Sequence, residues 1–140
     1  MNDLATFLRT RLDEDEAAAR AASPGPWHVN AEADEVLAVD GITVCDGFAL
    51  SGRQLRATTE YIARHDPARV LAEVDAKRRI LDIHQVTSYD NSESGADEGY
   101  GCRECGWSAE YSDQGGWCET LRLLALPHVD HPDYQDTWRS

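Results

Sequence analysis

The chain has 140 residues, 41% of them hydrophobic, and its 26 acidic and 13 basic residues give a formal net charge of −13 at pH 7. Because each phosphate contact needs a cation, this balance argues against a general nucleic-acid-binding surface; it suits solubility, a basic protein partner or mimicry of nucleic acid. No apolar run approaches the ~20 residues of a membrane span, and the first residues, MNDLATFLRTRLDEDE, lack the apolar region of a signal peptide. We therefore expect a cytoplasmic protein with reduced thiols and no membrane segment.

The first predicted element is a helix over residues 3–21, capped by Asn2 or Asp3. Apolar residues recur there at helical spacing and are expected to form its buried face. They are Leu4, Phe7, Leu8 and Leu12. The sequence SPGPW at residues 23–27 ends this helix, because proline lacks an amide hydrogen and clashes with the preceding turn.

A small antiparallel sheet is predicted next. Residues 36–39 and 42–45 are apolar, β-branched runs separated by Asp-Gly at 40–41, the strongest short signal for a hairpin with a type I′ turn. Residues 27–30 are a candidate third strand. Cys45, at the end of the second run, is interpreted as a small buried hydrophobic residue and is not assigned to a metal.

Two further helices are predicted after the sheet. The first covers residues 53–64. The second covers residues 67–84, because Asp66 can cap a helix and Pro67 fits its first turn. His84 extends the apolar face of this second helix at its C-terminal end, so its side chain is expected to point inward.

The C-terminal part of the chain has weaker signals. Residues 85–98 are polar, contain glycine and show no periodicity, which predicts a mobile loop. Short strands are predicted over residues 100–102 and 107–111. A short helix is expected from Cys118 to Leu126, because the proline that follows stops it.

These elements predict an α+β fold. It consists of an N-terminal helix, a small antiparallel hairpin or sheet, two further helices and a C-terminal zinc-ribbon-like segment. We expect a single domain over residues 1–140. Its α+β core is residues 1–84, and residues 99–140 form a zinc-binding segment packed on that core, beyond the loop at 85–98.

Three cysteines point to a metal site. Cys102 and Cys105 form a Cys-x-x-Cys pair, which places two thiolates on one tight turn, and Cys118 follows at a spacing typical of zinc ribbons. Cys118 also precedes a predicted helix, whose dipole favours a thiolate at that end. The alternatives are a redox pair of thiols, for which the expected βαβ context is missing, and cysteines that bind no metal.

The fourth ligand is predicted to be His84, because it points inward at a helix end just before the cysteine segment. His128 and His131 are the other candidates. A histidine in the core or capping the helix C-terminus is the simpler interpretation of His84 alone. His28 and His65 are expected on the surface or in loops.

A site of three cysteines and one histidine has no open position for a water nucleophile, so the expected Zn²⁺ is structural. The zinc-deaminase pattern fails, because Gln85 and Val86 follow His84 and Gly101 precedes Cys102. The chain has no phosphate-binding loop and no Gly-x-Ser-x-Gly motif. We therefore expect a protein that is not an enzyme.

Three stretches of the sequence resemble a small family of unknown function found in actinobacteria, mainly Streptomyces, and their phages. They are LATFLRTRLDEDEAAARAASPGPW, YIARHDPARVLAEVDAKRRIL and TLRLLALPHVDHPDYQDTWR, and the resemblance covers nearly the whole chain. Residues 20–75 are also loosely similar to Ead-like phage early proteins. The resemblance implies a cytoplasmic bacterial or phage protein with a histidine after the RRIL stretch, then Cys-x-x-Cys and a further cysteine, and it implies no activity.

Two kinds of function remain open. The first is an acidic protein-binding or adaptor protein with structural zinc, which could act between phage and host. Its candidate interface anchors are Tyr89, Trp107, Trp117 and Trp138, although these rings could simply cover the zinc site. The second is a nucleic-acid-binding zinc module, in which such aromatic residues stack on bases; the acidic composition argues against it.

Overall fold

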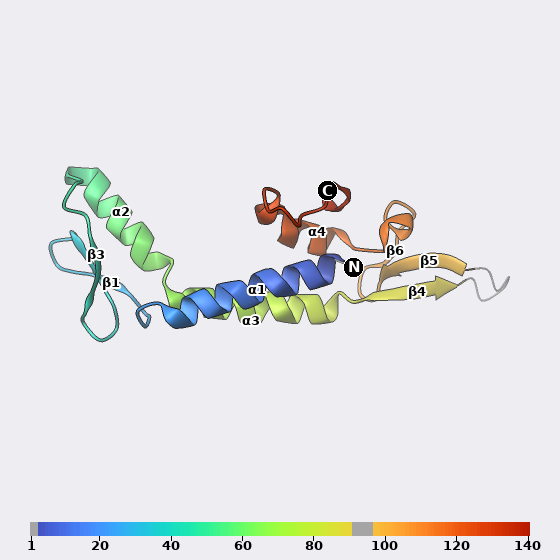
Figure 1. Ribbon diagram of the computed structural model, residues 1–140, viewed down its shortest axis with the longest axis horizontal. Helices are drawn as coiled ribbons and strands as arrows, with labels where there is room; N and C mark the ends of the chain where they lie inside the picture. The colour runs from blue at the N-terminus through green and yellow to red at the C-terminus, as the bar shows by residue number, and fades with distance from the viewer. Residues whose placement is uncertain (1–2, 91–96) are drawn as a thin grey trace. The chain divides into compact units, whose positions relative to one another are not determined.

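The structure is a computed structural model and describes residues 3–90 and 97–140 (Figure 1). Over these residues it has four α-helices and two small antiparallel sheets, which confirms the α+β fold class. The chain divides into two compact units, one of residues 1–12 and 76–140 and the other of residues 13–75. The single domain stays a prediction. Among the described helices, none is both long enough and apolar enough to cross a membrane.

The unit of residues 13–75 contains the first sheet. Strands β1 (His28–Val29), β2 (Glu35–Leu37) and β3 (Thr43–Asp46) are antiparallel neighbours in chain order. Helix α2 (Gly52–Arg64) contacts β1 and β2. The buried hydroxyl of Thr59 on α2 donates a hydrogen bond of 2.9 Å to the carbonyl of Ala33, which fixes the helix against the loop that joins β1 to β2.

The hairpin between β2 and β3 lies where the sequence predicted it, but its turn differs. Gly41 donates its N–H to the carbonyl of Ala38 at 2.9 Å, and Gly41 alone in this turn has a positive φ, of 81°. A type I′ turn would need positive φ at Asp40 as well, so that prediction was wrong. The arrangement matches a longer hairpin loop, in which a turn without positive φ is followed by a left-handed glycine.

Two long helices, α1 (Leu4–Ala21) and α3 (Pro67–Ile83), agree with the predicted ranges to within a residue at each end. Each begins at an aspartate whose carboxylate accepts a backbone N–H of the first turn. Asp3 accepts from Thr6 at 2.7 Å, and Asp66 accepts from Arg69 at 2.8 Å. The second carboxylate oxygen of Asp66 accepts the N–H of Trp27 at 2.8 Å, so this cap also fixes the chain after the SPGP turn.

The other unit, of residues 1–12 and 76–140, is built around the start of α1. The four apolar residues predicted for the inner face of that helix are all buried. The ring of Phe7 lies 5.1 Å from that of Trp138, which is 3% exposed and belongs to the C-terminal tail. Helix α4 (Glu119–Ala125) contributes Leu121 and Ala125, both buried. The expectation that Trp138 is available as an interface anchor was therefore wrong.

This unit also contains the second sheet. Strands β4 (Val86–Asp90), β5 (Asp97–Cys102) and β6 (Gly106–Trp107) are antiparallel neighbours in chain order. The loop predicted over residues 85–98 was wrong for the parts in β4 and β5; residues 91–96 lie outside the described residues. The strand predicted over 107–111 reaches only Trp107, because the chain then turns into a short 3₁₀ helix, Ser112–Gln114.

The strand predicted over residues 100–102 is confirmed as the end of β5, and glycines explain why the signal did not extend over the whole strand. Gly101 has no side chain to contribute to an alternating pattern, but the sheet requires a residue without a side chain at this position. A Cβ at Gly101 would lie 2.9 Å from the ring of Tyr89 and 2.8 Å from the backbone of Trp107. The glycine therefore lets the Tyr89 ring lie against β5, where the Tyr89 hydroxyl donates a 2.8 Å hydrogen bond to the carbonyl of Cys102.

Candidate metal centre

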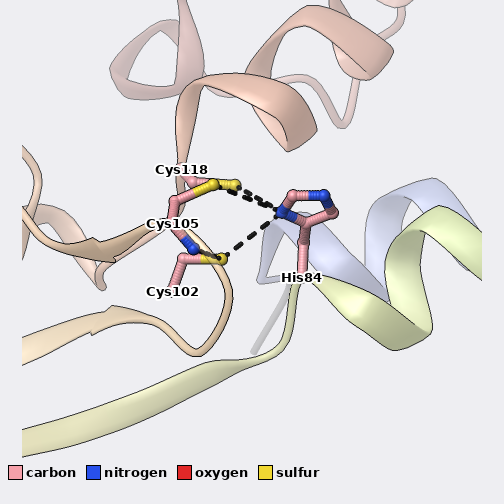
Figure 2. Close-up of side chains that lie close together, drawn as sticks. All are labelled: His84, Cys102, Cys105 and Cys118. Atoms are coloured by element: carbon pink, nitrogen blue, oxygen red, sulfur yellow. Dashed lines mark hydrogen bonds between the residues drawn. The ribbon is translucent and has the colours of Figure 1, made fainter.

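His84 is placed by the end of α3. Its backbone N–H donates to the carbonyl of Ile80 at 3.0 Å, which completes the last turn, and β4 begins two residues later at Val86. The half-buried side chain points away from the helix axis toward the three cysteines (Figure 2). Its Nδ1 atom is the one that faces their sulfur atoms.

Cys102 and Cys105 are placed by the turn that joins β5 to β6. Cys102 pairs with Gly106 across this turn, and the backbone N–H of Cys105 donates to the Cys102 Sγ at 3.3 Å. Gly106 has φ of +94°, a left-handed conformation that favours glycine. The turn therefore holds both sulfur atoms on one side, with the Cys105 N–H directed at the Cys102 sulfur.

Cys118 is placed at the N-cap of α4. Its backbone is extended, with φ of −74° and ψ of 165°, and its carbonyl accepts the N–H of Arg122 at 3.1 Å. The sulfur therefore lies at the positive end of the helix dipole. Cys118 is 7% exposed and Cys102 is 1% exposed, so two of the three thiols are buried.

The distances match a tetrahedral site. The His84 Nδ1 atom lies 3.4 Å from the Cys102 Sγ, 3.4 Å from the Cys105 Sγ and 3.7 Å from the Cys118 Sγ. For a tetrahedral metal with bonds of about 2.3 Å to sulfur and about 2.0 Å to nitrogen, a sulfur and a nitrogen ligand lie about 3.5 Å apart. All four donor atoms lie within 4.8 Å of one another. The group can hold a metal ion.

Without a metal, the environment of the Cys105 thiol disfavours its ionisation. The pKa of the Cys105 thiol is raised from 9.0 to about 12 by desolvation, by hydrogen bonds with Cys102 and Cys118, and by the charges of the same two sulfur atoms. Cys105 is exposed as a residue, but its sulfur points into the cluster (Figure 2). Three sulfur atoms so close together can all be thiolates only if a cation neutralises them.

The other candidates of the sequence lie elsewhere. His128 and His131 stack edge-on against the Phe7 ring at 6.0 and 5.6 Å, and His131 also contacts Arg11. Neither belongs to the metal-binding group found among residues 3–90 and 97–140. Cys45 is half-buried in β3 of the other unit and lies outside this group, as expected.

The whole sequence, residues 1–140, matches a family model described as "Family of unknown function (DUF6221)". The chain belongs to this family. The family description gives no activity, and no curated protein or solved structure matches the chain. The expected Streptomyces or phage origin and the similarity to Ead-like proteins stay predictions.

Sequence reasoning missed one charged residue that supports the site of this DUF6221 chain. Arg122 is 1% exposed, and its Nε and Nη1 atoms donate to the carbonyls of Trp117 and Thr137 at 2.8 and 2.6 Å. Its guanidinium lies 4.1 Å from the centre of the Tyr111 ring. Arg122 thus fixes the segment just before Cys118 to the C-terminal tail. Its position one turn after Cys118 gave no signal, because an arginine in a short helix usually faces solvent.

Proposed function

We propose that this chain is a protein-binding protein, not an enzyme, in which His84, Cys102, Cys105 and Cys118 hold a structural Zn²⁺. The convergence of one imidazole nitrogen and three sulfur atoms at tetrahedral spacing carries this proposal. Thiolates with imidazole in a tetrahedral set are the ligands that Zn²⁺ prefers. The role of the metal is to join the end of α3, the β5–β6 turn and the start of α4.

The closed ligand set supports a structural role. Catalytic zinc sites usually have three protein ligands and keep a fourth position for water or substrate, whereas four protein ligands complete a tetrahedron. The sequence has no other catalytic constellation. A cytoplasmic location, where thiols stay reduced and free to bind metal, fits the same proposal. The sequence resemblance supports a role in bacteria or their phages, including contact between a phage and its host.

The charge of the chain supports a protein partner. The net charge of −13 disfavours phosphate contacts. The metal-binding segment has the same bias, because residues 100–119 contain four acidic residues and one arginine. Exposed aromatic residues in this segment, Tyr100 at 53% and Trp107 at 42%, supply the kind of side chain that anchors protein interfaces.

The same two exposed rings favour a second candidate function, binding of single-stranded nucleic acid by base stacking. Oligonucleotide binding at ~50 mM salt distinguishes the two, because phosphate contacts give tight binding that weakens steeply as salt is added. We expect no such binding. Tight, salt-sensitive binding would overturn the protein-binding proposal in favour of the nucleic-acid-binding one.

The direct test of the proposal uses the zinc-loaded chain as bait in bacterial lysate, with Cys105→Ser as the matched bait. Native mass spectrometry under reducing conditions first establishes one Zn²⁺ per chain. We expect a defined protein partner to be enriched on the zinc-loaded bait and lost on Cys105→Ser. A purified chain that carries no zinc, or that enriches nothing over the variant, contradicts the proposal.

A further inference from the structure

A hollow of about 170 Å³ lies beside the metal-binding turn. Its wall combines aromatic rings, two of the metal-binding cysteines and one carboxylate; the side chains that matter here are those of Tyr100, Trp107, Tyr111, Cys105, Cys118 and Glu119. The hollow is therefore not purely apolar. Aromatic faces and negative charge together are the chemistry that binds organic cations.

Glycines keep the hollow open on its inner side. Gly116 has φ of +77°, and a Cβ there would lie 2.7 Å from the backbone of Gly101 and Tyr100. Gly101 and Gly116 both line the hollow and are buried. The backbones of β5 and the loop before α4 therefore approach each other as closely as two glycines allow, and the aromatic rings stand around this floor.

The charges around the hollow are mainly negative. Glu119 accepts a 2.6 Å hydrogen bond from the Tyr111 hydroxyl, which holds the carboxylate at the rim. With zinc bound, three thiolates and one neutral imidazole give the metal centre a net charge of −1, and two of those thiolates line the hollow. Arg122 is the opposing charge; its Nε and Nη1 atoms donate to two carbonyls, its guanidinium lies against the Tyr111 ring, and its buried Nη2 atom has no hydrogen-bond partner among the described residues.

We propose that this hollow binds a cationic side chain of the partner protein, a lysine or an arginine. The alkyl stem packs on the rings of Tyr100 and Trp107, and the charged head lies between the rings and the Glu119 carboxylate. This inference rests on the proposed function, since the partner is a protein and the metal holds two walls of the hollow in place. It adds the chemistry of the residue that the partner presents.

The test titrates the full-length, zinc-loaded chain with Nα-acetyl-lysine amide, Nα-acetyl-arginine amide and the neutral Nα-acetyl-norleucine amide. Binding is followed by the NMR signals of the Trp107 indole and of the Gly101 and Gly116 amides. We expect a cationic probe to bind at least about threefold more tightly than norleucine, the difference that a cation–π contact at an exposed site supplies. The lysine and arginine arms decide which cation the hollow prefers.

Two variants localise the binding, and one serves as control. Trp107→Ala removes a ring that is 42% exposed, and Glu119→Gln removes the charge while keeping an acceptor for Tyr111. Each is expected to weaken the cationic probe at least about threefold. Phe48→Ala removes a 91% exposed ring of the other unit and is expected to change nothing.

Equal binding of norleucine and the cationic probes, or unchanged binding in Trp107→Ala and Glu119→Gln, overturns the inference. So does a zinc-loaded chain that binds none of the probes, and that result leaves the zinc-dependent partner binding of the proposed function intact. A chain that binds the cationic probes but carries no zinc has the opposite meaning. It supports the hollow and contradicts the structural zinc.

Discussion

Replacement of Cys105 by serine should cost far more stability than replacement of Cys45. In the proposed site the metal joins His84 to Cys118, which are 34 positions apart. The chain entropy of closing a loop of that length corresponds to about 4 kcal/mol of the free energy of unfolding. At about 3 °C per kcal/mol for a chain of this size, loss of the metal should lower the Tm by roughly 12 °C.

Cys45→Ser is the matched control, because it makes the same chemical change at a half-buried strand position outside the metal-binding group. We expect it to cost about 1 kcal/mol, the usual effect of a single substitution. Thermal unfolding is measured with and without a chelator. The chelator should lower the Tm of the wild type and of Cys45→Ser, and leave that of Cys105→Ser unchanged. Equal losses in the two variants, or a wild type that the chelator does not affect, would refute the reasoning.

Three further predictions follow from single contacts. In the metal-free chain the pKa of Cys105 is raised, so between about pH 9 and pH 12 the folded state keeps a proton that the unfolded state loses. The free energy of unfolding measured in urea should therefore fall as the pH rises through this range. The zinc-loaded chain should not show this fall. Gly116→Ala should lower the free energy of unfolding by about 2 kcal/mol more than Gly41→Ala. Both glycines have positive φ, but a Cβ at Gly116 would lie 2.7 Å from backbone atoms, whereas a Cβ at Gly41 would have no atom within 4 Å. Equal losses would contradict the close approach at Gly116. Asp66→Ala removes both the cap of α3 and the acceptor of the Trp27 N–H, so urea unfolding should show a loss of about 2–3 kcal/mol in the free energy of unfolding. Asp3→Ala removes a cap alone and should cost about 1 kcal/mol. A loss in Asp66→Ala no larger than that in Asp3→Ala would show that the second hydrogen bond adds no stability.

The helices and the convergence of His84 with the three cysteines could be predicted because their signals are local. Asp66-Pro67 marks the start of α3 within one turn, and the Cys102-x-x-Cys105 spacing fixes two donors on one tight turn. His84 could be chosen over His128 and His131 because the helix period carries its direction to the end of α3. His128 and His131, the alternatives that the sequence left open, pack on Phe7, a contact between the two ends of the chain that no local pattern reports.

The second sheet could be predicted only in part: residues 100–102 and 107 were placed in strands, whereas β4 and the start of β5 were predicted as a loop. Strand β5 includes Gly99 and Gly101. Gly101 pairs with Thr87 of β4, and its lack of a side chain leaves room for the Tyr89 ring. With weak strand propensity, β5 depends on its cross-strand pairing with β4 and β6. The buried Arg122 and the hollow beside Trp107 also depend on contacts between segments, so they appear only in the folded chain.

The central claim is that one zinc ion is held by one nitrogen and three sulfur ligands. X-ray absorption at the zinc edge of the purified, reduced protein tests it most directly. The account predicts three sulfur ligands at about 2.3 Å and one nitrogen ligand at about 2.0 Å. It also predicts that Cys105→Ser leaves the protein without bound zinc. A purified protein without zinc, or one whose zinc is bound by oxygen and nitrogen alone, would contradict it.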